Sequence, residues 1–242
     1  MMHRRDISIF ISRILINIML LGAFASGAKA AEYPEESFPP GQRGSTKALP
    51  VDTIPTFRGF AVSVDAVGAG ELLLGDYGQM EAALRINLKD KYFPILELGY
   101  GKADKEDETK YNHFKTKAPY ARIGLDFNVL KNKHDIYRLY AGFRYAFTSY
   151  KYDVSNSQVT DPVWGDNAPF SVTGQKGSTQ WLEFVFGTDV KIAGPFHLGW
   201  SVRYKRRLFH SEGEIGPAWY IPGYGRGGNS CMGGTFNVIL EF

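Results

Sequence analysis

The amino-acid sequence predicts an all-β fold, an eight-stranded antiparallel up-and-down barrel that crosses a membrane. Three observations lead to this prediction. Apolar and polar residues alternate in eight separate segments, as they do in half-buried strands. The connections between the segments are alternately short and long. The polar faces carry glycines and charges of both signs, and the apolar faces carry aromatic residues, which is typical of membrane barrels.

Composition supports β-structure and argues against nucleic-acid binding, disulfides and thiolate metal sites. Aromatic residues make up 14% of the 242 residues and there are 27 glycines, which favours strands joined by tight turns. The formal net charge of +3 comes from residues 1–30, so the remainder is neutral and does not indicate a nucleic-acid partner. Cys231 is the single cysteine, which excludes an intramolecular disulfide and a thiolate metal site.

Residues 1–30 have the parts of a secretory signal peptide. Arg4 and Arg5 form its positive region, residues 14–24 its apolar region, and residues 28–30 a small-x-small cleavage pattern. The apolar region is shorter than the roughly 20 residues of a spanning helix, so an uncleaved anchor is the less favoured alternative. No later segment is long and apolar enough to span as a helix, so any membrane crossing would use strands.

The mature chain is expected to begin with a leader and continue as one barrel, residues 56–242. Residues 31–55 contain five prolines and no apolar periodicity, which predicts a disordered periplasmic leader. In each alternating segment that follows, residues two apart line one face of a strand. The predicted strands are 56–67, 78–89, 92–102, 119–130, 136–149, 180–191, 196–208 and 232–242.

The connections predict how the barrel is oriented. The short ones are 90–91, 131–135 and 192–195, and the long ones are 68–77, 103–118, 150–179 and 209–231. Outer-membrane barrels have short periplasmic turns and long extracellular loops. An even number of strands then places both ends of the barrel at the periplasmic rim. A ten-stranded barrel is the alternative if 150–179 contains a hairpin, for which 171–173 is a candidate.

Alternation alone does not show which face is buried. A soluble barrel would bury the apolar face, whereas a membrane barrel turns it towards lipid. Glycines on the polar faces suit a narrow interior, and aromatic residues near the ends of the apolar faces suit interfacial girdles. Buried charges must be paired, so we expect an interior network that holds the barrel together. Its expected members are Glu81, Arg85, Glu97, Arg122, Asp126, Arg144, Glu183, Asp189 and Arg203.

The sequence contains long and specific runs, among them LLGDYGQMEAALRINLKDKYFPILELGYGKAD, KNKHDIYRLYAGFRYAF, DPVWGD, GPFHLGWSVRYKRR and AWYIPGYG. Together, over residues 57–242, they resemble a Bacteroidota family of outer-membrane barrel proteins of unknown function. A weaker similarity is to small OmpX- and OmpA-type barrels. The resemblance implies a location in the outer membrane, in contact with its lipid, and it supplies no catalytic residues to transfer.

The strand 232–242 resembles the last strand of bacterial outer-membrane barrels, because it alternates up to Phe242. It is expected to close the barrel against residues 56–67 at the periplasmic rim. By the same resemblance, Phe242 is expected to be the signal that the barrel assembly machinery reads.

The search for chemistry yields weak candidates. His210 and Ser211 are adjacent, and neighbours on a strand point to opposite faces, which disfavours a catalytic contact. The acidic run 104–108 could bind Ca²⁺ weakly, but a solvated loop tip is favoured. We therefore expect no catalytic residue, no metal site and no cofactor.

Aromatic residues also lie in the long loops, and they could form a surface that binds a sugar or a protein. The favoured alternative is that they pack on one another and cap the barrel. The expected function is non-enzymatic, with a structural or surface-interaction role and no ligand indicated. A lipid-modifying enzyme and a narrow channel or transporter are the alternatives. The loop aromatics are Trp164, Trp219, Tyr220 and Tyr224.

Overall fold

In the computed structural model, the strands lie within the unit Asp52–Phe242. The described residues are 55–107, 112–133, 136–159, 165, 169–211, 213–214 and 216–242. The predicted signal peptide and, apart from Pro55, the predicted leader lie outside the described residues, as does Trp164.

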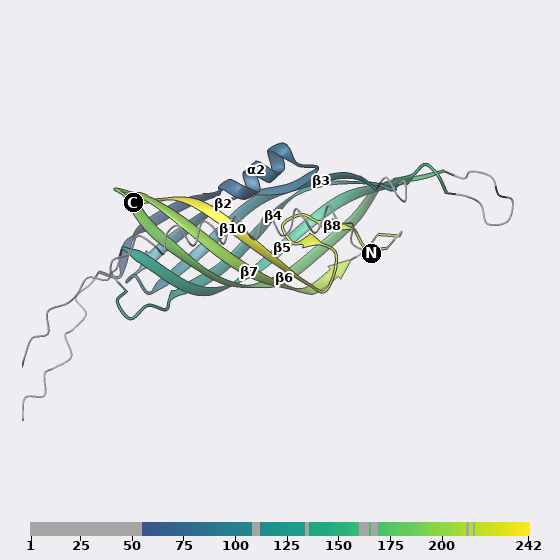
Figure 1. Cartoon of the computed structure of the whole chain (residues 1–242). Helices are drawn as coiled ribbons and strands as arrows, with labels where there is room; N and C mark the ends of the chain where they lie inside the picture. The colour runs from purple at the N-terminus through teal and green to yellow at the C-terminus, as the bar shows by residue number, and fades with distance from the viewer. Residues whose placement is uncertain are drawn as a thin grey trace, which may run out of the picture. The chain divides into compact units, whose positions relative to one another are not determined.

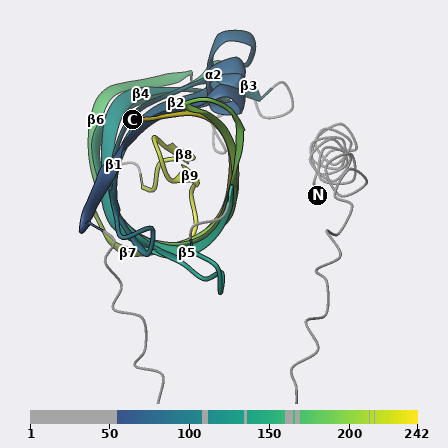
Figure 2. The same cartoon turned by 90° about the vertical axis from the view of Figure 1, so that its left-hand side faces the viewer.

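Eight antiparallel strands form a closed barrel, which confirms the predicted fold (Figures 1 and 2). Each strand pairs with its neighbours along the chain, and the last strand pairs with the first. The strands are β1 (Phe57–Asp65), β2 (Tyr77–Leu88), β3 (Tyr92–Asp107), β4 (Asn112–Asn128), β5 (Tyr137–Asn156), β6 (Phe170–Ala193), β7 (Phe196–Ser211) and β10 (Ser230–Glu241).

The two rims differ, and we name them by their connections. The short-turn rim carries the β2–β3, β4–β5 and β6–β7 turns, and the long-loop rim is the opposite end. Phe242 lies at the short-turn rim, where its N–H donates to the Phe60 carbonyl oxygen at 2.8 Å. Phe60 N–H in turn donates to the Phe242 carbonyl oxygen at 3.0 Å, so the expected closure against the first strand is present.

The strand register climbs around the barrel. From Tyr137 in β5, successive cross-strand partners lead through all the other strands and return to β5 at Phe147, ten residues further along. A shift of this kind requires strands that are tilted relative to the barrel axis. Consequently, directly opposite residues differ in height, and a row of partners rises towards the long-loop rim from β3 to β6.

The ten-stranded alternative is wrong. β5 and β6 run well beyond their predicted ends, and they pair with each other up to Asn156 and Phe170. Residues 171–173 therefore extend β6 and do not begin an additional hairpin. β4 likewise begins at Asn112, before the predicted start at residue 119. The strands continue into the predicted loops because cross-strand pairing overrides the local preference of the residues there.

A short helix, α2 (Ala66–Leu74), occupies the predicted loop after the first strand and includes two residues assigned to that strand. Its sequence AVGAGELLL contains two alanines, three leucines and one glutamate, which are good helix formers. The helix lies outside the barrel wall and packs on β2 (Figures 1 and 2). Leu73 and Leu74 point away from the protein, with exposed fractions of 82% and 92%. Within the described ranges, no helix has the length and apolar character needed to cross a membrane.

The β7–β10 connection folds back into the barrel. It contains two short strands, β8 (Tyr220–Ile221) and β9 (Gly225–Arg226), which pair with each other. Viewed along the barrel, this hairpin lies within the ring of strands (Figure 2). We call residues 216–229 the plug loop.

The barrel wall is polar inside and apolar outside. Arg122 and Glu97 have exposed fractions of 0% and 1%, whereas Ile123 and Phe184 are both 60% exposed. Neighbouring residues on one strand thus have opposite surroundings, as the pleat requires. A soluble barrel has the reverse arrangement.

Candidate functional site

The middle of the barrel is filled by an ionic layer, which we define as Glu81, Glu97, Arg122, Asp126, Arg144, Glu183 and Arg203. The structure places all seven inside, and all are buried. Glu97 on β3 lies at the centre of the layer because three guanidinium groups converge on its carboxylate. Arg122 and Arg144 each contact it at 3.1 Å, and Arg203 contacts it at 2.8 Å.

The strand register explains why these side chains meet. Glu97 is the cross-strand partner of Arg122, and Asp126 is the partner of Gly142, two residues before Arg144. Partners on one face of a sheet have Cβ atoms about 4.5–5.5 Å apart, within reach of a salt bridge. Contacts of Arg203 with Glu81 and Glu97 join strands that are not neighbours, which only the closure of the barrel permits.

Each cation of the layer contacts at least two carboxylates. Arg122 forms ion pairs with Glu81 and, between Nε and Oε1 at 2.9 Å, with Glu183. Arg203 contacts Glu81 at 2.8 Å and Glu183 at 3.6 Å. A buried ion costs several kcal/mol in desolvation unless it is paired, so this sharing is what permits burial.

Arg144 also forms a two-point contact with Asp126, with N–O distances of 2.6 and 2.8 Å. Glycines beside these residues leave space for the long side chains. A Cβ atom at Gly124 would lie 2.5 Å from Cδ of Arg144, and one at Gly142 would lie 2.0 Å from Oδ1 of Asp126. The glycines on the polar faces thus have a steric function inside the barrel.

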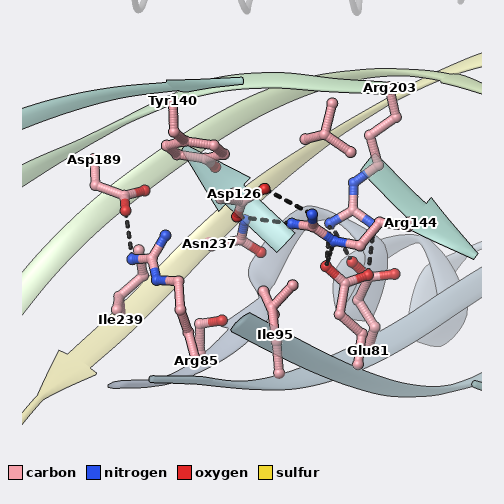
Figure 3. Close-up of a pocket in the computed structure, with 14 residues that line it drawn as sticks. Glu81, Arg85, Ile95, Asp126, Tyr140, Arg144, Asp189, Arg203, Asn237 and Ile239 are labelled. Atoms are coloured by element: carbon pink, nitrogen blue, oxygen red, sulfur yellow. Dashed lines mark hydrogen bonds and ion pairs between the residues drawn. The ribbon is translucent and has the colours of Figure 1, made fainter. Parts of the chain in front are cut away.

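A second ion pair joins Arg85 and Asp189 (Figure 3). Both residues lie towards the short-turn ends of their strands, β2 and β6. The Arg85 guanidinium faces the rings of Phe93 and Tyr140, 5.5 and 5.7 Å from their centroids. A cavity of about 20 Å³ is lined by this pair and by Arg144 of the ionic layer. That volume holds about one water molecule, and ligand pockets measure about 300–1,000 Å³. The cavity is therefore too small for an organic ligand.

The short-turn rim has its own charge cluster, whose pairing the sequence did not indicate. Arg138 donates to both carboxylate oxygens of Glu241, at 2.6 and 2.8 Å. Glu241 also accepts from Asn87 at 3.3 Å, and Asn87 donates to Asp90 at 2.7 Å. Three segments that are distant in sequence meet here, so no local pattern could have shown the contact.

Sequence reasoning also missed the neutral donors of the network. Tyr120 donates its hydroxyl to Glu81 at 3.0 Å, and Trp181 donates Nε1–H to Glu183 at 2.6 Å. Each of these aromatic residues stands two positions before a charged member of the layer, Arg122 or Glu183, and therefore on the same strand face. That spacing is a signal by which they could have been found.

The plug loop closes the long-loop half of the lumen. The carbonyl oxygen of Gly223 accepts from Arg122 at 2.9 Å and from Lys205 at 2.7 Å. Gly223 has φ of 81°, a conformation that favours glycine, and a Cβ atom there would lie 2.5 Å from Cγ of Tyr120. The loop is thus attached to the ionic layer through its backbone.

Two loop aromatics are inside the barrel, which corrects the surface exposure considered for them. Tyr220 and Tyr224 are 4% and 0% exposed, and the Tyr224 ring lies 5.6 Å from that of Trp181. Burial raises the pKa of both hydroxyls, so they stay protonated at neutral pH. The loop folds inward because its carbonyl groups satisfy buried cations. Of the expected set, Trp219 is 37% exposed.

The weak catalytic and metal candidates acquire no site geometry. His210 and Ser211 both belong to β7, and the Ser211 hydroxyl lies 3.1 Å from that of Ser178. Asp104 of the acidic run bonds to His113 at 2.7 Å and to Lys115 at 3.1 Å. In the part of the chain that the structure describes, no group of three or more His, Cys, Asp or Glu could hold a metal ion.

Fold and interior together define the class: an eight-stranded barrel protein with a filled polar core and an apolar outer wall. Residues 7–242 match the family model described as Domain of unknown function (DUF6048), and the chain belongs to that family. This confirms the expectation of a family of unknown function. A search of curated protein sequences finds no match.

Three solved structures illustrate what this chain is similar to. Neisserial surface protein A is 13% identical, with 77% of this chain and 99% of that chain covered and a TM-score of 0.40. A major outer membrane protein from Thermus thermophilus is 14% identical, covering 76% and 98%, with a TM-score of 0.45. Ail, the attachment invasion locus protein of Yersinia pestis, crystallised with the heparin analogue sucrose octasulfate, is 13% identical, covering 76% and 94%, with a TM-score of 0.36.

Proposed function

We propose that this protein is a closed, non-enzymatic barrel of the outer membrane with a structural or surface-interaction role. The observation that carries the proposal is the reversed polarity of the barrel wall. Buried charges fill the lumen, and large apolar side chains point outwards. Such a wall is stable in lipid and would aggregate in water.

The outward apolar side chains come from every strand of the barrel. Examples are Val62 at 40% exposed, Leu98 at 57% and Phe147 at 51%. The protruding leucines of α2 extend this surface, because Leu73 and Leu74 would enter the outer leaflet beside β2. Apolar groups of this size favour a lipid environment by about 1.5–3 kcal/mol each.

Three barriers in series support a barrel that does not conduct. The charge cluster closes the short-turn rim, the ionic layer fills the middle, and the plug loop fills the long-loop half. An eight-stranded barrel is just wide enough for side chains to fill. A permeating ion would have to break several buried ion pairs, which disfavours the alternative of a channel or transporter.

The non-enzymatic role remains part of the proposal. It is supported by the position of His210 and Ser211 on one strand, where successive side chains point to opposite faces. A barrel enzyme acting on lipid would lose activity when Ser211→Ala or His210→Ala is introduced. Altered lipid A in a deletion strain, restored by wild type and not by these variants, would contradict the proposal.

Membrane fractionation tests the location. We expect the protein in the outer-membrane fraction, and we expect an unheated sample to migrate differently from a boiled one because the closed barrel resists detergent. Recovery of a soluble periplasmic protein would overturn the location and, with it, the lipid-facing role of the apolar wall.

Planar bilayer recordings test closure. We expect no conductance for the wild type, and none after residues 218–227 are replaced by a glycine–serine linker, because the ionic layer still fills the lumen. A steady conductance in the wild type would favour the channel. A conductance in the linker variant alone would show that the plug loop is the single barrier.

Export and assembly complete the proposal on sequence grounds. The signal peptide of residues 1–30 would deliver the chain to the periplasm, and Phe242 would be read by the barrel assembly machinery. Deleting Phe242 should lower the amount of inserted protein, and unchanged membrane levels would refute the assignment. A Bacteroidota origin rests on the sequence resemblance alone, and the genomes that encode the family would test it.

A further inference from the structure

Four lysines stand directly opposite one another on neighbouring strands. Lys102 of β3 pairs with Lys117 of β4, Lys117 pairs with Lys151 of β5, and Lys151 pairs with Lys176 of β6. We call these four residues the lysine row. Neighbouring strands lie about 4.8 Å apart, so four positive charges form a continuous line across the sheet.

The lysine row is on the outer surface of the barrel. All four side chains are exposed, whereas the residues directly before and after Lys102, Lys117 and Lys151 are buried. Ala103, Thr116 and Tyr150, for example, are 0%, 2% and 5% exposed. Since adjacent residues point to opposite faces, the lysines point away from the lumen.

This arrangement is electrostatically unfavourable for the protein alone. Like charges directly opposite each other destabilise a sheet, and the row contains three such pairs. Among the described residues, no carboxylate forms a salt bridge with any member of the row. A partner from outside the chain would remove the repulsion.

In the next row towards the long loops, opposite charges face each other, as is usual for charged cross-strand partners. There Asp104, Lys115 and Asp153 are successive cross-strand partners, so the signs alternate. Asp104 contacts Lys115 at 3.1 Å, and Asp153 accepts from the Gly174 N–H at 2.7 Å. The two acids are thus bound to groups other than the lysine row.

The other side of the lysine row borders the apolar wall. Tyr100 stands two residues before Lys102 on the same face and is 39% exposed. On β5, Phe147 and Tyr145 precede Lys151 by four and six residues, and they are 51% and 37% exposed. Aromatic residues at this level mark a membrane interface. The row therefore begins where the apolar wall ends.

The tilt of the strands spreads the row over a range of heights. Lys102 lies lowest, beside the apolar wall, and Lys176 highest, because rows of partners rise from β3 to β6. The polar headgroup zone of a bilayer is about 5–8 Å thick on each side. The row thus extends through the layer in which lipid phosphates lie.

We propose that the lysine row binds the phosphate groups of a phosphorylated lipid in the outer leaflet. The proposal rests on the membrane location proposed above. A lipid is favoured over a soluble polyanion because the lysines face sideways, next to the apolar wall, and not into a loop cleft. Lysine suits this role because its mobile ammonium group can follow phosphates that are not held at fixed positions.

Binding of bisphosphorylated lipid A tests the proposal. The protein is folded in neutral detergent, and its affinity is measured by the anisotropy of a fluorescent lipid A and, separately, of its dephosphorylated form. Each basic side chain near an anionic lipid is worth roughly fivefold in affinity. We expect Lys102→Gln, Lys117→Gln, Lys151→Gln and Lys176→Gln together to weaken binding of the phosphorylated form at least tenfold.

Two control variants isolate the row. Lys115→Gln removes a lysine of the same face that already contacts Asp104, and it should change affinity less than twofold. Replacing Lys91, Lys131 and Lys191 at the short-turn rim by Gln lowers the charge at the other end and should leave affinity unchanged. Arginine at all four row positions should retain binding.

The outcomes separate the two proposals. A heat-modifiable gel shift shows for each variant whether the barrel is folded, and two double variants, one for each half of the row, replace the fourfold variant if it does not fold. Equal affinity of the wild type for phosphorylated and dephosphorylated lipid would overturn the lysine row alone. Lysine-dependent binding of a heparin fragment without lipid preference would also overturn it. A failure of the wild type to insert would overturn the membrane location.

Discussion

The arginines inside the barrel and the lysines on its outer face carry the same charge in opposite electrostatic settings. In the ionic layer, Arg122 contacts three carboxylates within 3.1 Å. In the lysine row, Lys117 has a lysine on either side. The interior charges are thus satisfied by the protein itself, whereas the exterior ones are arranged for something that the protein does not contain.

Residue chemistry matches this difference. All three cations of the ionic layer are arginines, whose planar guanidinium makes several hydrogen bonds in fixed directions. Every member of the row is a lysine, a hydrated point charge on a flexible stem. Fixed geometry suits a core that must be unique, and a mobile charge suits a fluid partner. The predictions below test this contrast.

The largest effect is expected for Glu97→Gln. This change removes the negative charge that Arg122, Arg144 and Arg203 share, and it leaves buried cations without sufficient compensation. Breaking a buried ion pair costs about 3–5 kcal/mol. Urea unfolding of the vesicle-inserted protein measures the loss. Glu106→Gln, at an exposed position further along the same strand, is the control and should cost less than about 0.5 kcal/mol.

A comparable loss in both variants would contradict the distinction between the inside and the outside of β3. It would show that carboxylates stabilise this strand irrespective of burial.

The next effect concerns the Arg85–Asp189 pair. Arg85→Met and Asp189→Asn should each destabilise the barrel, since each leaves one buried partner uncompensated. The double variant should lose less than the sum, with a coupling energy of about 2–3 kcal/mol. Unfolding of all four proteins in vesicles completes the cycle. Strictly additive losses would mean that the pair contributes through packing alone.

Two glycines compare the space available inside the barrel with the space on its outer face. A Cβ at interior Gly124 would lie 2.1 Å from the Phe143 carbonyl oxygen, so Gly124→Ala should cost about 1–2 kcal/mol. At Gly234, on the outer face, the nearest atom would be 3.4 Å away, and Gly234→Ala should be within about 0.5 kcal/mol of the wild type. The heating temperature at which the folded band disappears from the gel compares the stability of the two variants. Equal behaviour would show that the interior can expand.

The smallest effect is expected for the lysine row in neutral lipid. Replacing all four lysines by glutamine removes three like-charge pairs and should raise stability by a few tenths of a kcal/mol at low salt. Added salt should screen the repulsion between the lysines and so raise the stability of the wild type to that of the variant. Lys115→Gln, which loses an attractive contact, should shift stability in the opposite direction. A clear loss in the fourfold variant would show that the row is already compensated within the protein.

Part of the site was predictable because alternation assigns residues to faces. All nine charged residues expected inside are buried there. Their partners were not predictable, since a contact such as Arg203 with Glu81 crosses the lumen between strands far apart in sequence. The plug loop shows the same limit. The sequence favours packing of Tyr224 in a cap over exposure on a binding surface, but its place inside the lumen depends on Trp181 and on cations of strands distant along the chain.

The lysine row shows a different limit of prediction from sequence, which is the strand register. Each lysine is visible in the sequence, and the face of Lys102 follows from alternation, whereas the other three lie in predicted loops. That they stand in one line depends on the register of three strand pairs, including strand extensions that the sequence pattern did not reveal. A shift of one residue in any pair would have turned one lysine to the other face.

The sequence by itself determined the all-β class and which residues share one face of a strand, because strand alternation is a local property of period two. Tertiary structure decided which charges meet, that the last long loop enters the lumen, and that four lysines form a line. These features depend on closure, tilt and register, which arise from pairing between segments that are distant along the chain.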